Sequence, residues 1–248
     1  MIEIQDILLC VFAGLFAGII NTLAGSGSII TLSLLAFLGL PANVANGTNR
    51  IGLLFQSSAS SLKFYKQGEL SVSNRIGLLF VTVFGAVIGV VIASRITVSN
   101  FENILGCIFV LLFFVVLFKP QKYLEKSSFL VKSLPLIFGL IGFYAGFIQA
   151  GAGVFMLAVM HAVWGKPITE LNPLKVFIIL LVNIVALIGY AWAGQINWQF
   201  GLALAAGQLL GGLIGVRLNN FKKAIEPLIK IFLLVLILIS IVKFWRFI

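Results

Sequence analysis

Long apolar runs, separated by short polar or Gly-rich connections, fill most of the chain. A run of about 20 apolar residues, coiled into an α-helix, is long enough to cross the hydrocarbon core of a bilayer. We predict ten helical segments, most of them transmembrane: 4–23, 28–40, 44–65, 76–94, 101–118, 133–149, 154–164, 174–193, 200–216 and 225–244. The second and seventh have only about a dozen apolar residues and follow a Gly-x-Gly sequence. Each is expected to form the short arm of a hairpin whose Gly-rich tip lies within the membrane.

The sequence nearly repeats itself at an offset of about 126 residues. Matching positions are Gly25-Ser26-Gly27 with Gly151-Ala152-Gly153, Pro41 with Pro167, Asn46 with Asn172, Gly39 with Gly165, Gly68 with Gly194, and Gly85-x-x-x-Gly89 with Gly211-x-x-x-Gly215. Because each copy has an odd number of segments, the second copy must be inverted relative to the first. We predict an all-α integral membrane protein built as an inverted repeat: 1–120, a cytoplasmic linker over 121–132, and 133–248. Such doubling, with Gly-broken segments at corresponding places, is typical of transporters whose site lies between the halves.

The composition is typical of an integral membrane protein. Hydrophobic residues make up 61% of the chain and charged residues 10%, and the mean hydropathy is +1.17. The net charge of +10 does not indicate nucleic acid here, because Lys and Arg in a membrane protein report its orientation. They gather in the third-to-fourth, fifth-to-sixth and ninth-to-tenth connections, which a count of crossings places on one side. We predict that the connection 119–132 is cytoplasmic and that Gln195 is external.

Polar side chains cluster at the two Gly-x-Gly tips and in two Asn-containing stretches, 46–50 and 172–175, which we interpret as turns. A helix that begins at a Gly-x-Gly presents unpaired N–H groups and a partial positive charge, so two facing tips favour an anion. Arg50 and Lys175 add one cation to each half; each either recruits an anion or only snorkels to the interface. The candidate substrate-binding residues are Asn21, Thr22, Gly25, Ser26, Gly27, Ser28, Asn46, Thr48, Asn49, Arg50, Gln56, Gln149, Gly151, Gly153, Asn172 and Lys175.

The glycines divide into two expected roles. A methyl group at Gly27 or Gly153 is expected to obstruct the approach of a ligand to the tips. Gly85-x-x-x-Gly89 and the similar small-residue patterns are expected to serve close helix packing instead.

The distribution of titratable residues argues against several functions. All seven acidic residues lie at termini, in connections or at segment edges, which disfavours proton pumps, cation antiporters and intramembrane aspartyl chemistry. His161 is the only histidine, and we interpret it as packed or pore-lining. No catalytic residue, metal or cofactor is expected.

Several of these motifs together resemble a known family. The run 17–28 (Ala-Gly-Ile-Ile-Asn-Thr-Leu-Ala-Gly-Ser-Gly-Ser), then Leu38-Gly39-Leu40-Pro41, then 45–50 (Ala-Asn-Gly-Thr-Asn-Arg), is similar to the first-repeat signature of the sulfite exporter TauE/SafE family. The likeness covers nearly the whole chain. It implies transport of small sulfur-containing anions, such as sulfite, thiosulfate or an organosulfonate, across a prokaryotic inner membrane. The second repeat departs from the signature and reads Asn172-Pro173-Leu174-Lys175, so the site need not be symmetric.

We therefore expect a multi-pass transporter, not an enzyme, that moves a small anion by alternating access at a midplane site, with the lipid bilayer as its other partner. One alternative is transport of a different solute, such as a carboxylate or a neutral sulfur compound. Another is a membrane-embedded assembly factor or enzyme. The sequence leaves the oligomeric state, the coupling ion and the direction of transport open.

Overall fold

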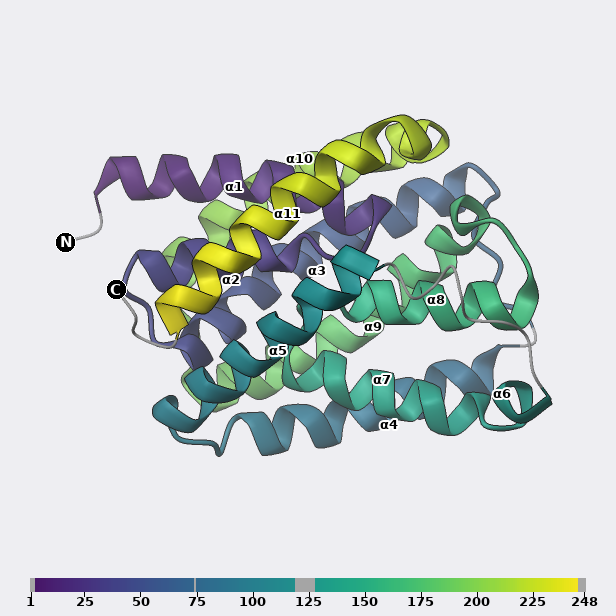
Figure 1. Ribbon diagram of the computed structural model, residues 1–248, viewed down its shortest axis with the longest axis horizontal. Helices are drawn as coiled ribbons and strands as arrows, with labels where there is room; N and C mark the ends of the chain where they lie inside the picture. The colour runs from purple at the N-terminus through teal and green to yellow at the C-terminus, as the bar shows by residue number, and fades with distance from the viewer. Residues whose placement is uncertain (1–2, 74, 119–127, 245–248) are drawn as a thin grey trace.

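A computed structural model describes residues 3–73, 75–118 and 128–244 as a bundle of helices (Figure 1). The first half contains α1 (Ile4–Leu23), α2 (Ser28–Phe37), α3 (Ala42–Lys66), α4 (Ile76–Ala93) and α5 (Val98–Phe118). The short helix α6 (Ser128–Lys132) precedes the second half, which contains α7 (Leu134–Phe147), α8 (Ala152–Trp164), α9 (Ile168–Trp192), α10 (Trp198–Leu218), a 3-10 turn (Asn219–Phe221) and α11 (Lys222–Phe244). No strand occurs in the described ranges, so the all-α prediction is confirmed. The short α6 occupies part of the expected linker, and 119–127 lie outside the described residues.

Helix lengths agree with a membrane protein. Among the described residues, five helices are long and apolar enough to cross a bilayer: α1, α4, α5, α9 and α10. Large apolar side chains on their outer faces are exposed, as Phe80 at 72% and Trp192 at 92% illustrate, because lipid takes the place of water there. By contrast α2 has 10 residues and α8 has 13, so each is about 15–20 Å long and too short to cross. The prediction of short second and seventh segments is confirmed.

The internal repeat is visible in the backbone. Both α3 and α9 have 25 residues, and each begins directly after a proline, Pro41 or Pro167, with nearly the same φ and ψ. The glycines that have a positive φ among the described residues fall into pairs 126 residues apart: Gly25 with Gly151, Gly39 with Gly165, and Gly68 with Gly194. Corresponding helices run in opposite directions along the long axis, as α1 and α7 or α5 and α11 show in Figure 1. These directions support an inverted arrangement of the halves.

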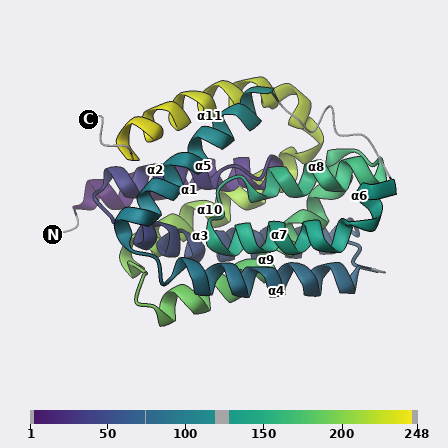
Figure 2. The same ribbon diagram turned by 60° about the horizontal axis from the view of Figure 1, so that its bottom comes forward.

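The two halves interlock through their first and fourth helices. Helix α1 packs along α10, and α7 packs along α4, while α3 and α9 contact each other centrally. Figure 2 shows α5 and α11 on one side of this bundle and α4 with α7 on the opposite side. A Cβ built on Gly89 would overlap the carbonyl oxygen of Phe143, and one on Gly211 would overlap that of Leu15. These glycines therefore let helix backbones touch, as expected for small-residue patterns.

The two Asn-containing stretches are helical, and their interpretation as turns was wrong. Asn46 and Arg50 lie inside α3, and Asn172 and Lys175 lie inside α9, which begins six residues before the predicted start at 174. A proline directly before a helix has no N–H to leave unpaired, so it favours a helix start there. The asparagine side chains bond to the ends of other helices instead of competing for their own backbone.

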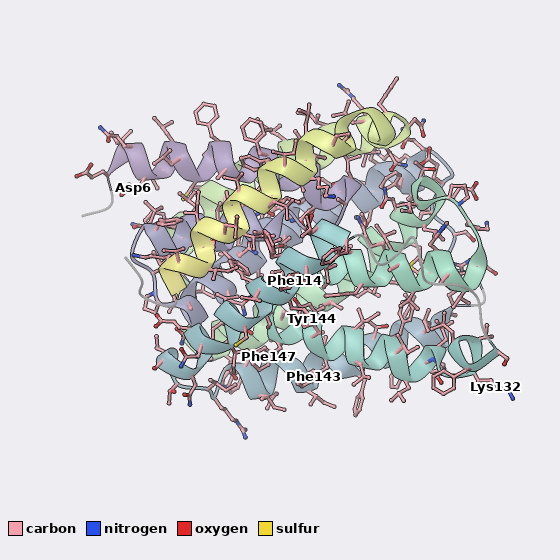
Figure 3. All side chains as sticks on the ribbon, in the orientation of Figure 1. Asp6, Phe114, Lys132, Phe143, Tyr144 and Phe147 are labelled. Atoms are coloured by element: carbon pink, nitrogen blue, oxygen red, sulfur yellow. The ribbon has the colours of Figure 1, made fainter. Side chains whose placement is uncertain are left out.

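The basic connections lie at one end of the molecule. The α3–α4 connection, α6 and the turn between α10 and α11 lie together at the right of Figure 1. Lys132 lies at this end and Asp6 at the opposite end in Figure 3. The arrangement supports the expected orientation.

Candidate functional site

The tips of the two Gly-broken hairpins touch each other. Gly25 and Gly151 have φ values of +81° and +71°, a region that glycine adopts without strain. A Cβ on Gly25 would lie 2.5 Å from Cα of Gly153, and one on Gly153 would lie 2.6 Å from Cα of Gly25. Two chain reversals from different halves are therefore in backbone contact, away from both ends of the molecule (Figure 1).

Polar side chains surround the start of α2. Ser28 donates its backbone N–H to Asn21 Oδ1 at 3.2 Å, and Asn21 Nδ2 donates to Ser28 Oγ at 3.4 Å. Asn21 thus satisfies one donor at the start of α2. Thr31, in the next turn of α2, donates to Asn49 Oδ1 of α3 at 2.7 Å, and Gln208 Nε2 of α10 donates to the same oxygen at 3.1 Å. This cluster joins four helices, α1, α2, α3 and α10, at the first tip.

The second tip is held by an aromatic hydroxyl and an amide. Tyr144, labelled on α7 in Figure 3, donates its hydroxyl to the carbonyl oxygen of Ala150 at 2.5 Å. Gln149 is 2% exposed, and its Oε1 accepts a hydrogen bond from Arg50 at 2.9 Å. The loop before α8 is therefore fixed by α7 on one side and by α3 on the other.

Arg50 is completely buried and caps the carboxyl end of α7. Its Nη1 donates to the carbonyl oxygen of Ala145 at 2.8 Å, and its Nη2 donates to that of Gly146 at 3.1 Å. The guanidinium also lies 5.4 Å from the ring centroid of Tyr190. Among the described residues, its hydrogen-bond partners are all neutral. The positive charge therefore faces the negative end of the α7 dipole.

Lys175 does the same for α1. It is 0% exposed, and its Nζ donates to the carbonyl oxygens of Asn21 and Thr22, each at 2.8 Å. Each half therefore sends a cation from its third helix to the carboxyl end of the first helix of the other half. Neither cation reaches the interface, so snorkelling is excluded for both.

The two repeat-related asparagines follow the same crossed pattern. Asn46 Nδ2 donates to the carbonyl oxygen of Phe147 at 2.9 Å, and to the Tyr190 hydroxyl at 2.8 Å. Asn172 Nδ2 donates to the carbonyl oxygen of Leu23 at 3.3 Å. Each asparagine thus satisfies the last carbonyl of a helix that leads into a hairpin tip.

The remaining predicted residues lie in three places. Gln56 Nε2 donates to Thr22 Oγ1 at 2.9 Å, which forms a second polar cluster between α3 and α1. Thr48 Oγ1 accepts the backbone N–H of Asn197 at 2.9 Å, near the start of α10. Ser26 is 2% exposed in the first tip. A Cβ on Gly27 would overlap the carbonyl oxygen of Ala17, so this glycine permits packing within its own hairpin and its absent side chain does not face a ligand.

Two buried donors at this centre have no partner among the described residues. They are Nδ2 of Asn49 and Nε of Arg50, which belong to consecutive residues of α3. Oε1 of Gln208, bonded to Asn49 through its other amide atom, is also unpartnered. Gln208 and Tyr190 were not among the predicted residues, although a single amide or hydroxyl in an otherwise apolar run was a usable signal. Buried unpaired donors are costly in a membrane and favour a bound acceptor.

A bundle of membrane-length helices, with two broken hairpins meeting at buried cations, defines a multi-pass membrane protein of the transporter class. A family model described as Sulfite exporter TauE/SafE matches residues 10–244. The chain therefore belongs to the sulfite exporter TauE/SafE family, and the resemblance seen in the sequence is confirmed.

Relatives from several bacteria carry transporter names. The chain is 26% identical over 236 residues to a probable membrane transporter protein of Haemophilus influenzae, covering 93% of this chain and 91% of the relative. It is 27% identical over 226 residues to the probable membrane transporter protein ORF9 of a Sinorhizobium species, covering 88% and 86%. It is 24% identical over 268 residues to the probable membrane transporter protein YunE of Bacillus subtilis, covering 95% and 96%. No solved structure matches the chain. The protein is a membrane transporter and not an enzyme.

Proposed function

We propose that the protein moves a small oxyanion, most of all a sulfur-containing one such as sulfite, thiosulfate or an organosulfonate, across the prokaryotic inner membrane. The observation that carries this proposal is the pair of unpartnered buried donors, Asn49 Nδ2 and Arg50 Nε, beside the touching hairpin tips. A small oxyanion offers several acceptors in a compact volume, so it can accept a hydrogen bond from such buried donors. The family description names sulfite, which agrees with this chemistry.

The balance of charge at the centre also favours an anion. The carboxyl end of a helix carries only about half a negative charge, whereas Arg50 carries a full positive one. The α7 end therefore neutralises Arg50 in part, and the same holds for Lys175 at the α1 end. The starts of α2 and α8 add partial positive charge at the tips. A monovalent anion between the halves offsets the remaining charge.

Alternating access between inverted halves is the mechanism that we propose for this movement. The touching tips support a site between the two halves, which each half would reach from its own side of the membrane. An inside-negative potential drives a negative charge outward by about 2.3 kcal/mol per 100 mV, which favours export. Transport of a carboxylate and a role as an assembly factor are the rival functions.

Flux into proteoliposomes and ligand-induced thermal shifts distinguish these functions. We expect sulfite, thiosulfate or sulfoacetate to raise the melting temperature and to cross the membrane, and acetate to do neither. Asn49→Leu is expected to weaken anion binding by about tenfold, because it removes a buried donor. Asn100→Leu, the same substitution on the exposed face of α5, is the matched control. Flux of acetate alone would establish the carboxylate rival, and no flux of any of these solutes would favour the assembly factor.

A further inference from the structure

A cavity of about 330 Å³ opens at the end of the molecule that carries the basic connections. It separates the α3–α4 connection from the start of α9. The residues that matter here are Glu69 and Ser71 on one wall, Thr169, Pro173 and Leu174 on the other, and Asn220 beside them.

The opposite end of the molecule has no such separation between the α9–α10 connection and the start of α3. A Cβ on Gly47 would overlap the carbonyl oxygen of Gln195, so the connection lies directly on the helix. Asn197 donates its backbone N–H to Thr48 Oγ1 at 2.9 Å, and Gln195 Nε2 donates to the carbonyl oxygen of Ser94 at 3.0 Å. These contacts close this end.

The two ends are built from repeat-related residues. At the offset of 126 residues, the members of the closed contact and of the cavity wall correspond one to one: Gly47 with Pro173, Thr48 with Leu174, Ser94 with Asn220, Gln195 with Glu69, and Asn197 with Ser71. One interface is thus present twice, closed in one copy and open in the other.

We propose that the cavity is the open cytoplasmic entrance of the substrate path, that the Gly47–Gln195 contact is the closed external entrance, and that transport exchanges the two. This inference rests on the proposed alternating-access function. Two repeats in different conformations are what such a mechanism requires, because each adopts the shape of the other in the opposite state.

The cavity is lined by charged residues at positions whose counterparts 126 residues away are uncharged. Arg75 lines the cavity, whereas its counterpart Gly201 packs against Ile51 of α3. Glu69 and Arg75 belong to one wall, and Lys166 and Glu170, 3.6 Å apart, belong to the other. When the walls approach, each acid finds a cation on the opposite wall. At the closed end, Gly47 lets the carbonyl oxygen of Gln195 lie directly on the helix. Its counterpart Pro173 has a side chain at that position, so we expect the cytoplasmic entrance to close through side-chain contacts.

Cysteine accessibility tests the exchange. Asn43, which is 7% exposed at the closed end, is the counterpart of Thr169 in the cavity wall. In purified protein in nanodiscs, with Cys10 and Cys107 replaced, we expect maleimide to label Thr169→Cys quickly and Asn43→Cys slowly. Adding Gly47→Ala places a methyl group against the Gln195 carbonyl and should open that contact. Labelling at 43 should then rise about tenfold while labelling at 169 falls.

Gly77→Ala is the control, because a Cβ there meets nothing within 4 Å. Should Gly47→Ala fail to fold, Thr48→Val removes only the hydrogen bond from Asn197 and is expected to shift both rates less, in the same directions. A rise at 43 with an unchanged rate at 169 would mean that the entrances are independent, which overturns the inference. The labelling measurement uses no substrate, so it stays valid even if the proposed substrate class is wrong. Conversely, normal sulfite flux would not save this inference if the labelling rates at 43 and 169 did not change in opposite directions.

Discussion

A buried cation in a membrane protein must find compensation within the protein, and Arg50 finds it in helix carbonyls. Its two terminal nitrogens contact oxygens of Ala145 and Gly146, with further bonds to amide side chains. A carboxylate partner would have cancelled its charge, whereas carbonyl dipoles reduce it only in part. Arg50 therefore satisfies the carboxyl end of α7, and in the proposed function its remaining charge attracts an anion.

Substituting Arg50 should affect stability and binding together. Arg50→Gln removes the charged donor to the Ala145 and Gly146 carbonyls of α7, and hydrogen bonds to charged groups contribute about 1.5–3 kcal/mol. We expect a lower melting temperature in detergent and weaker sulfite binding by calorimetry. Lys63→Gln is the comparison, because Lys63 is partly buried and, within the described part of the chain, its Nζ donates to the carbonyl oxygen of Leu213 alone. Equal, small changes in both variants would reduce Arg50 to an orientation signal.

Residue chemistry was partly accessible from the sequence. The pairing of one cation per half and the polar character of Asn21, Asn46 and Asn172 follow from residue type and from the repeat. Their partners do not, because Arg50 contacts a helix that lies 95 residues further along the chain. Only the fold brings such distant positions together, and the local hydrophobic pattern does not indicate which residues will be in contact.

At the scale of helices, glycine positions decide which backbones touch. The first helix of each half contacts the fourth helix of the other half through glycines such as Gly85, Gly89, Gly207 and Gly211. The hairpin tips use glycine differently, since Gly25 and Gly151 adopt a left-handed backbone that side chains disfavour. The sequence predicted the helices well, but it placed the start of α9 too late, because polar residues inside a helix read as a turn.

A methyl group at Gly27 should therefore destabilise the fold in the way that one at Gly89 does. Each new Cβ overlaps a carbonyl oxygen, of Ala17 or of Phe143, and such overpacking costs about 1–3 kcal/mol. We expect both alanine variants to melt earlier and to lose flux in proportion to folded protein. Gly77→Ala should behave like the wild type. Normal stability with abolished flux in Gly27→Ala would instead restore the expectation that the methyl group obstructs the ligand.

For the whole molecule, orientation follows from where the basic connections lie. The α3–α4 connection, α6 and the α10–α11 turn share one end, and positively charged connections stay in the cytoplasm. Gln67 and Ala193 directly follow α3 and α9 as their C-cap residues, correspond at an offset of 126 residues, and are both exposed. If the halves are inverted, these two positions lie on opposite sides of the membrane.

Single cysteines at Gln67 and Ala193, in a background without Cys10 and Cys107, test this arrangement in intact cells. An impermeant maleimide should label Ala193→Cys directly and label Gln67→Cys only after the membrane is permeabilised. Both positions cap equivalent helices and are exposed. A difference in their labelling therefore reports the side of the membrane on which each lies, and not a difference in local exposure. Labelling of both from outside would contradict inversion. Labelling of Gln67→Cys alone would keep the inversion but reverse the orientation, and the cavity would then open to the exterior.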